Sequence, residues 1–150
     1  EAASGCYCPE NVFLRRLLRH LVVERDEVVI IDMEAGIEHL TRGTAEAVDA
    51  FVVVVEPGQR SIQTALTVKE MAKSLGVKNV FVAANKVREE QDVNFIKQGI
   101  KDMIFIGALS YDASILEADM KGIAPYENSP ALVKEVKEMK NSLEQHLGNS

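Results

Sequence analysis

Three short apolar runs stand out along the chain, at residues 28–31, 51–55 and 80–84. They are continuous rather than alternating and rich in β-branched residues, which is typical of parallel strands covered by other elements on both faces. A weaker fourth run lies at residues 103–106. We predict that these runs form strands of one sheet.

Helical patterns lie between and after these runs. An apolar stripe over residues 61–75 predicts one helix, with Gly76 as the residue that ends it. The polar segment 89–99 predicts a second helix. Strands that alternate with helices at this spacing predict an α/β fold, a mostly parallel sheet with flanking helices. We expect residues 1–150 to form a single domain.

The last helix is predicted to begin at Pro130, with Ser129 as its N-cap. Its apolar positions repeat at helical spacing, so we expect one face to pack on the sheet. The inward-facing residues should be Leu132, Val133, Val136, Met139, Leu143 and Leu147.

Composition narrows the possible settings and partners. Of the 150 residues, 47% are apolar and 27% are charged, an ordinary globular balance. The net charge of −6 argues against nucleic acid as a partner, because phosphate binding depends on clustered Lys and Arg. No apolar run reaches the ~20 residues of a membrane span, and no signal peptide is recognised. We therefore expect a cytoplasmic protein without a membrane partner.

Candidate chemistry follows the strands, because parallel sheets bind ligands beyond the carboxyl ends of their strands. Asp32 follows the first run, where a carboxylate is placed to hold Mg²⁺. Gly36 would let the backbone approach a phosphate closely. The alternative is that Asp32 only caps the following turn.

The ends of the next two strands carry further polar residues. Residues 56–61 are expected to form a turn into a helix whose N-terminus is able to attract an anion. The alternative, which we favour, is simple turn chemistry with Ser61 as the N-cap. Asn85 and Lys86 follow the third run. An Asn amide there can read the donor and acceptor edge of a base. A loop-forming Asn beside a solvated Lys fits these residues equally well.

Cys6 and Cys8 are the two cysteines of the chain. Two thiolates one residue apart make half of a tetrahedral site for a soft metal. A disulfide between them would be strained, because the closed ring is so small. The remaining ligands would come from His20, from His39 or from the same cysteines of a second subunit. Two free thiols beside a helix are the alternative.

Several segments together resemble one family. Residues 28–39, containing Asp32 and Gly36, resemble the D-x-x-A-G segment of the MinD-like, deviant Walker P-loop ATPases. Asn85-Lys86-Val87 resembles the strand end with which that group contacts adenine, and residues 107–112 resemble its last strand and loop. Within the group, the C-x-C pair and residues 34–39 are similar to the nickel-insertion accessory ATPases of carbon monoxide dehydrogenase.

The resemblance implies a nucleotide site for ATP or ADP with Mg²⁺. Asp32 would lie near the metal ion and Gly36 near the terminal phosphate, as the catalytic switch segment. Asn85, Lys86 and Ser110 would bind the nucleotide. Ser110 stands where the family usually has Pro, so this wall of the adenine pocket departs from the family pattern.

The resemblance also implies a metal and two partners. Cys6 and Cys8 would pair with their copies in a second subunit to hold Ni²⁺ or Zn²⁺, making the protein a homodimer. ATP-driven dimerisation would then load or release nickel for the carbon monoxide dehydrogenase apoenzyme. The function implied is that of an ATP-dependent metallochaperone.

The chain contains no G-x-x-x-x-G-K-[ST] loop or related lysine-bearing glycine loop. Without its amides and lysine a triphosphate loses its principal cradle. We therefore expect a C-terminal portion of a parent ATPase that is inactive alone. By resemblance, the absent strand belongs between runs 28–31 and 51–55. The gap would be closed, left open or filled by another molecule.

Two other classes of function fit parts of the sequence. A MinD-like positioning or regulatory ATPase would act through partners and a membrane, and it calls for a basic amphipathic C-terminal helix. Glu135, Glu138 and Glu144 interrupt the lysines of the last helix, which disfavours that reading. The other class is a metal or redox-sensing module that uses the thiols alone.

Overall fold

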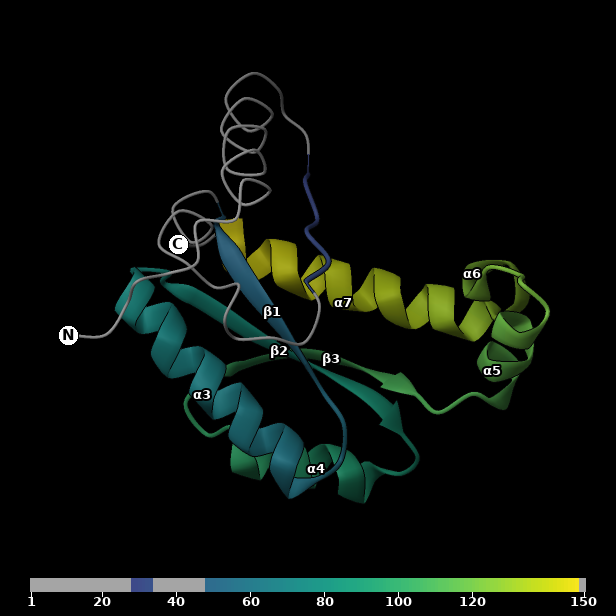
Figure 1. The fold of residues 1–150 in the computed structure, drawn as a ribbon, viewed down its shortest axis with the longest axis horizontal. Helices are drawn as coiled ribbons and strands as arrows, with labels where there is room; N and C mark the ends of the chain where they lie inside the picture. Colours follow the sequence, from purple (N-terminus) through teal and green to yellow (C-terminus); the bar gives the residue numbers. More distant parts are fainter. Residues whose placement is uncertain (1–27, 34–47, 149–150) are drawn as a thin grey trace, which may run out of the picture.

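The computed structural model of the protein describes residues 28–33 and 48–148. These residues form a parallel sheet flanked by helices, which confirms the predicted α/β class (Figure 1). In chain order the elements are β1 (Ala50–Val55), α3 (Gln59–Leu75), β2 (Asn79–Val87), α4 (Glu90–Gly99), β3 (Ile104–Ser110), α5 (Ala113–Met120), α6 (Pro125–Asn128) and α7 (Pro130–Gly148).

The described sheet has three parallel strands in the order β1-β2-β3. Figure 1 shows α3 and α4 on one face of the sheet and the long helix α7 across the other. Because both faces of β2 are covered, its sequence is apolar at successive positions rather than at every second one. The three strands confirm the predictions made from runs 51–55, 80–84 and 103–106.

Alternate residues of the strands enter two different cores. On the side of α3 and α4, Val82 and Ala84 pack with Ile96 of α4 and with Ile100, the C-cap of that helix. On the opposite side, Phe81 and its neighbours pack against three residues of α7: Met139, Leu143 and Leu147. Near its carboxyl end β2 also carries two polar residues outside these cores, half-buried Asn85 and exposed Lys86.

Helix α7 begins as predicted. The backbone N–H of Leu132 donates to Ser129 Oγ at 3.2 Å, so Ser129 is an N-cap. Val136, however, is 46% exposed, and its predicted inward position is wrong. Glu135 is turned toward the sheet instead, where it accepts hydrogen bonds from Ser110 at the end of β3.

Helix α3 begins earlier than the sequence suggested. Its N-cap is Gly58 rather than Ser61, which lies inside the first turn. Ser61 Oγ accepts a hydrogen bond from the backbone N–H of Glu56 at 3.0 Å, so it holds the preceding turn instead of capping the helix. Gly76 ends α3 in the left-handed conformation with φ 85°, as predicted.

Run 28–31 does not form the predicted strand. Residues 28–33 are described but contain no strand, and Val28 and Ile30 are 83% and 87% exposed. The physical reason is that run 28–31 has no strand to pair with among the described residues. There β1 pairs with β2 alone, and the outer edge of β1 bonds to no described strand. Of the outcomes considered for the gap beside β1, the described residues leave it open.

Candidate functional site at the carboxyl edge of the sheet

Strand β2 ends in a bulge. Its pairing with β3 runs from Ala84↔Ala108 to Val87↔Ser110, so Asn85 and Lys86 together oppose a single residue. Lys86 has φ 55°, a left-handed conformation that costs a non-glycine residue about 1–2 kcal/mol. Backbone outliers of this kind gather at functional sites. The bulge therefore draws attention to the two residues that the sequence proposed for nucleotide binding.

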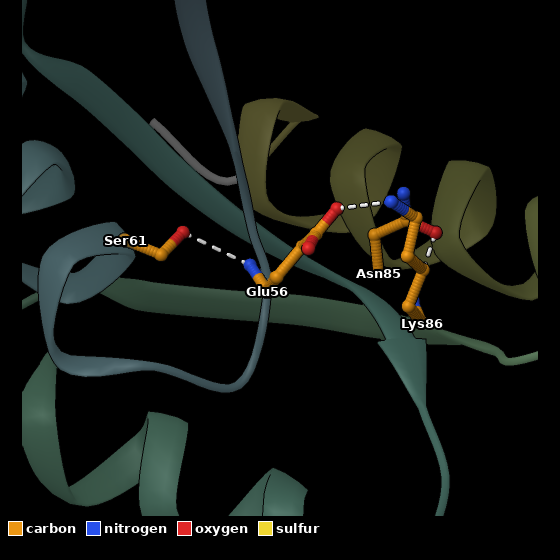
Figure 2. A network of polar contacts seen from close by, with 4 residues as sticks. All are labelled: Glu56, Ser61, Asn85 and Lys86. Carbon is orange, nitrogen blue, oxygen red and sulfur yellow. Dashed lines mark hydrogen bonds and ion pairs between the residues drawn. The ribbon is translucent and has the colours of Figure 1, made fainter.

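Polar contacts within the bulge and to Glu56, the residue after β1, are seen in Figure 2. Asn85 Oδ1 accepts a hydrogen bond from the backbone N–H of Lys86 at 2.9 Å. Lys86 Nζ lies 2.7 Å from Glu56 Oε1, and the Glu56 N–H donates to Ser61 Oγ. This network ties the end of β2 to the end of β1 and to the first turn of α3.

The amide of Asn85 keeps much of its hydrogen-bonding capacity. Its side chain is half-buried, and Oδ1 has one lone pair engaged by Lys86. Within residues 28–33 and 48–148, its Nδ2 group donates no hydrogen bond. A half-buried amide with two donors and one acceptor site available can read the edge of a base.

The corner after β3 is fastened to α7 at two points. Ser110 donates from its N–H and its Oγ to the Glu135 carboxylate, at 3.0 and 2.6 Å. Two residues later, Asp112 Oδ2 accepts from Ser129 Oγ at 2.7 Å, and Oδ1 accepts from the Ser114 N–H at 2.9 Å. We call these two contacts, Ser110–Glu135 and Asp112–Ser129, the clamp after β3.

The charge of Asp112 is stabilised by this clamp. Hydrogen bonds from Ser114 and then from Ser129 lower the pKa of Asp112 below its ordinary value of 3.8, since they favour the charged form. Asp112 is also the N-cap of α5. The Asp112 carboxylate thus joins the end of β3 to the first turn of α5 and to the N-cap of α7, and both of its oxygens accept hydrogen bonds.

Between the two points of the clamp lies Tyr111, which faces Arg88. The guanidinium carbon of Arg88 is 4.2 Å from the centre of the Tyr111 ring. The backbone holds both partners: the Tyr111 N–H donates to Val87 O at 2.8 Å, and the Arg88 N–H donates to Asp92 Oδ2 at 2.8 Å. A stacked cation and ring therefore border the ends of β2 and β3.

The structure brings together only part of the predicted site. Asn85, Lys86 and Ser110 lie at the ends of adjacent strands. Asp32 is described and exposed, in a segment without strand pairing, and its role at a Mg²⁺ ion stays a prediction. Gly36, Cys6 and Cys8 lie outside the described residues, as do the possible further metal ligands His20 and His39.

Sequence reasoning missed most of the residues that position this edge. Glu56, Arg88 and Glu135 were not proposed as site residues. Arg88 carried a usable signal, because it comes directly after Asn85-Lys86-Val87 at the end of a predicted strand. Glu135 carried none, since its contact with Ser110 joins residues 25 positions apart.

The described part of the chain contains neither a cluster of metal-binding side chains nor a membrane-spanning helix. No group of three or more His, Cys, Asp or Glu residues there is arranged to hold a metal ion. Among the same residues, no helix has the length and apolar character required to cross a membrane.

Several known proteins are similar to this chain in amino-acid sequence. The carbon monoxide dehydrogenase accessory protein CooC of Rhodospirillum rubrum is 47% identical over 131 residues, which cover 87% of this chain and 50% of that protein. An uncharacterized ATP-binding protein of Methanocaldococcus jannaschii is 43% identical over 144 residues, covering 94% of this chain and 55% of that protein. No family model matches the chain.

These similarities confirm the resemblance to the accessory ATPases of carbon monoxide dehydrogenase that the sequence motifs indicated. A second ATP-binding protein of Methanocaldococcus jannaschii is 40% identical over 132 residues. The chain spans about half the length of the curated relatives that it matches. The activity of a whole relative therefore does not transfer to this chain without a test.

Proposed function

We propose that this chain is part of an ATP-binding maturation factor for carbon monoxide dehydrogenase. The observation that carries the proposal is the 47% identity to the accessory protein of Rhodospirillum rubrum across 87% of the chain. Similarity to several ATP-binding proteins supports the nucleotide half of the proposal. The partner would be the carbon monoxide dehydrogenase apoenzyme.

Within this function, the carboxyl edge of the sheet provides the base-binding part of an ATP or ADP site. Asn85 is the residue proposed to read adenine, and its half-buried amide with available donors supports that role. Lys86 is engaged by Glu56, so it would contact nucleotide only by exchanging that partner. Ser110 is fixed by Glu135 and would form a wall of the site rather than a ligand.

The metal half of the proposal concerns nickel. Cys6 and Cys8 are proposed to bind Ni²⁺ or Zn²⁺ together with the same pair of a second subunit, because two thiolates provide half of a tetrahedral site. ATP bound between the subunits would then couple dimerisation to metal release. Asp32 and Gly36 are proposed to form the segment that responds to the terminal phosphate.

Isothermal titration of the reduced chain with Ni²⁺ and with Zn²⁺ tests the metal half. The expected result is binding at one metal per two chains, abolished in the Cys6→Ser/Cys8→Ser variant, with the mass of a dimer in light scattering. Binding that survives both substitutions would contradict the assignment of the cysteines. Co-elution with nickel-free carbon monoxide dehydrogenase tests the partner, and a chain that never co-elutes would contradict the maturation role.

The chain alone should hydrolyse no ATP, because its sequence contains no lysine-bearing glycine loop to hold the triphosphate. A phosphate-release assay with the wild-type chain and the Asp32→Asn variant checks this expectation. Turnover that depends on Asp32 would refute it.

A further inference from the structure

We propose that Arg88 is a base-stacking residue of the nucleotide site and that Tyr111 is the positioning residue that holds it. The inference rests on the proposed function and extends it, because it assigns a second contact to the adenine base beside the edge contact of Asn85. The adenine ring would lie on the face of the Arg88 guanidinium that is turned away from Tyr111.

Arg88 and Asn85 both lie at the carboxyl end of β2. Arg88 follows Asn85 by three residues, at the point where β2 leaves the sheet, and both residues lie at the edge where parallel sheets bind ligands. The Arg88 guanidinium is stacked 4.2 Å from the Tyr111 ring centre on one side. Arg88 itself is an exposed residue, so a ligand can reach its side chain.

The pair is ordered before any ligand binds. Binding with a free arginine would require the loss of up to about 2 kcal/mol of side-chain entropy. Here the Tyr111 ring already holds the guanidinium, the Arg88 N–H is bonded to Asp92, and the Ser110–Glu135 and Asp112–Ser129 contacts hold the corner that carries Tyr111. Less ordering therefore remains to be done when a planar ligand arrives.

Charge distribution favours a base over a phosphate at this point. The Lys86 ammonium, the other cation at the end of β2, is neutralised by Glu56 at 2.7 Å. The Arg88 guanidinium lies over an aromatic ring, and this group is planar, so it presents a planar surface rather than a point charge. A planar cation at the same strand end as an amide suits a purine, which offers a π-face and a donor–acceptor edge at once.

The experiment uses AMP as the probe and the reduced wild-type chain, followed by ¹H–¹⁵N correlation spectra. We expect shifts at Asn85, Arg88 and Tyr111, and intermolecular NOEs from adenine H2 and H8 to the Arg88 δ-methylene protons. Ribose 5-phosphate, which lacks the base, should leave these signals in place. The NOEs report a direct contact, which a purely structural role of Arg88 would not produce.

Substitutions separate stacking from charge and from folding. Arg88→Ala and Tyr111→Leu should each weaken AMP binding by about 5-fold or more, the effect of losing one stacking contact. Tyr111→Phe keeps the ring and should retain wild-type affinity. Lys97→Ala is the matched control, because Lys97 stacks on Phe105 at 4.9 Å elsewhere in the molecule and should not affect AMP.

Two outcomes would overturn the inference. If AMP binds with shifts at Asn85 and Arg88→Ala has unchanged affinity, the stacking role is wrong while the proposed function stands. If no chemical shift changes at these residues up to about 10 mM AMP, any binding is weaker than millimolar, and the inference and the base site at Asn85 both fail. The metal titration and the apoenzyme experiment would still judge the maturation role separately.

Discussion

Runs 28–31 and 51–55 have nearly the same chemistry and different structures. Both are short, continuous and rich in β-branched residues, yet residues 51–55 lie in β1 and residues 28–31 in no strand. Val55 is fully buried, whereas Ile30 is 87% exposed. The difference lies in their neighbours: β1 has hydrogen bonds to β2 and packs against α3.

The comparison shows that strand preference is mostly a preference for a pleated, half-buried surface. A run of valines has suitable side chains for a strand, but the strand forms only where a neighbouring strand provides hydrogen-bond partners. The predictions below test how much of the stability of β1 comes from its cover, from helix contacts beneath it and from polar contacts at its end.

The largest effect should come from placing a charge in each run. Val55→Asp buries an unpaired carboxylate and should cost about 4 kcal/mol or more of unfolding free energy. Ile30→Asp, at an exposed position, should change it by less than about 0.5 kcal/mol. Urea denaturation measures both. Equal losses would mean that run 28–31 is covered in solution, and the contrast between the runs would be lost.

A smaller effect should come from the helix contact beneath β1. Gly99 of α4 lies against α3 so closely that an added Cβ would stand 2.6 Å from Ile62 Cδ1 and 2.8 Å from Ile62 Cγ2. Gly99→Ala should therefore cost about 1–3 kcal/mol through overpacking.

The matched control for this contact is the Ile62→Val background, which removes the nearest carbon. In that background Gly99→Ala should cost less than in the wild type, since the two sites share one space. If thermal unfolding showed that the stability losses of Gly99→Ala and Ile62→Val simply add, the two residues would not share one space, and this prediction would be wrong.

The clamp after β3 should respond both to mutation and to acid. Ser129→Ala removes the N-cap of α7 and should cost about 1 kcal/mol. It should also raise the pKa of Asp112 toward 3.8, because one of the hydrogen bonds that lower this pKa is lost.

The sign of the pH effect follows from that lowered pKa. Asp112 contributes its stability above pH 3.8, and the contribution is lost as the pH falls through the lower folded-state value. Carbon-detected NMR titration of the Asp112 carboxyl measures the shift. Ser129→Thr keeps the hydroxyl and should preserve it; an unchanged Asp112 pKa in Ser129→Ala would contradict the clamp.

The smallest effect should come from the ion pair at the end of β1. Lys86 and Glu56 have side chains that are 58% and 52% exposed, so Glu56→Gln should cost about 0.5 kcal/mol. The difference from wild type should shrink in 0.5 M salt, as expected of a screened surface pair. A salt-independent loss would show that Glu56 acts through something other than its charge.

The sequence predicted the elements whose cause is local and missed those whose cause is a contact. Gly76 ends α3 because left-handed backbone favours glycine, and Ser129 caps α7 because its hydroxyl reaches a nearby N–H; both features can be recognised from a few residues. Run 28–31 carried the right side chains for a strand, but its pairing depends on a neighbour that no local pattern specifies.

The candidate site divides in the same way. Asn85 and Lys86 were recognisable because they follow a predicted strand, whereas the bulge that turns them depends on how β2 meets β3. Glu135, rather than Val136, faces the sheet from α7 because its carboxylate accepts hydrogen bonds from Ser110 at the end of β3. Helical periodicity reads only apolar and polar alternation, so it could not anticipate a buried-side glutamate with a distant partner.

The outer edge of β1 has a consequence for the behaviour of the chain at high concentration. Residues Ala50–Val55, with the sequence AFVVVV, are uncharged and without proline, and within the described residues one edge of this strand is unpaired. Six-residue segments of this kind assemble into cross-β stacks when their edges meet. Val52 and Val54 are 44% and 60% exposed beside that edge. Aggregation of the isolated chain should therefore begin here, and one lysine at Val54 should delay fibre formation as a gatekeeper charge.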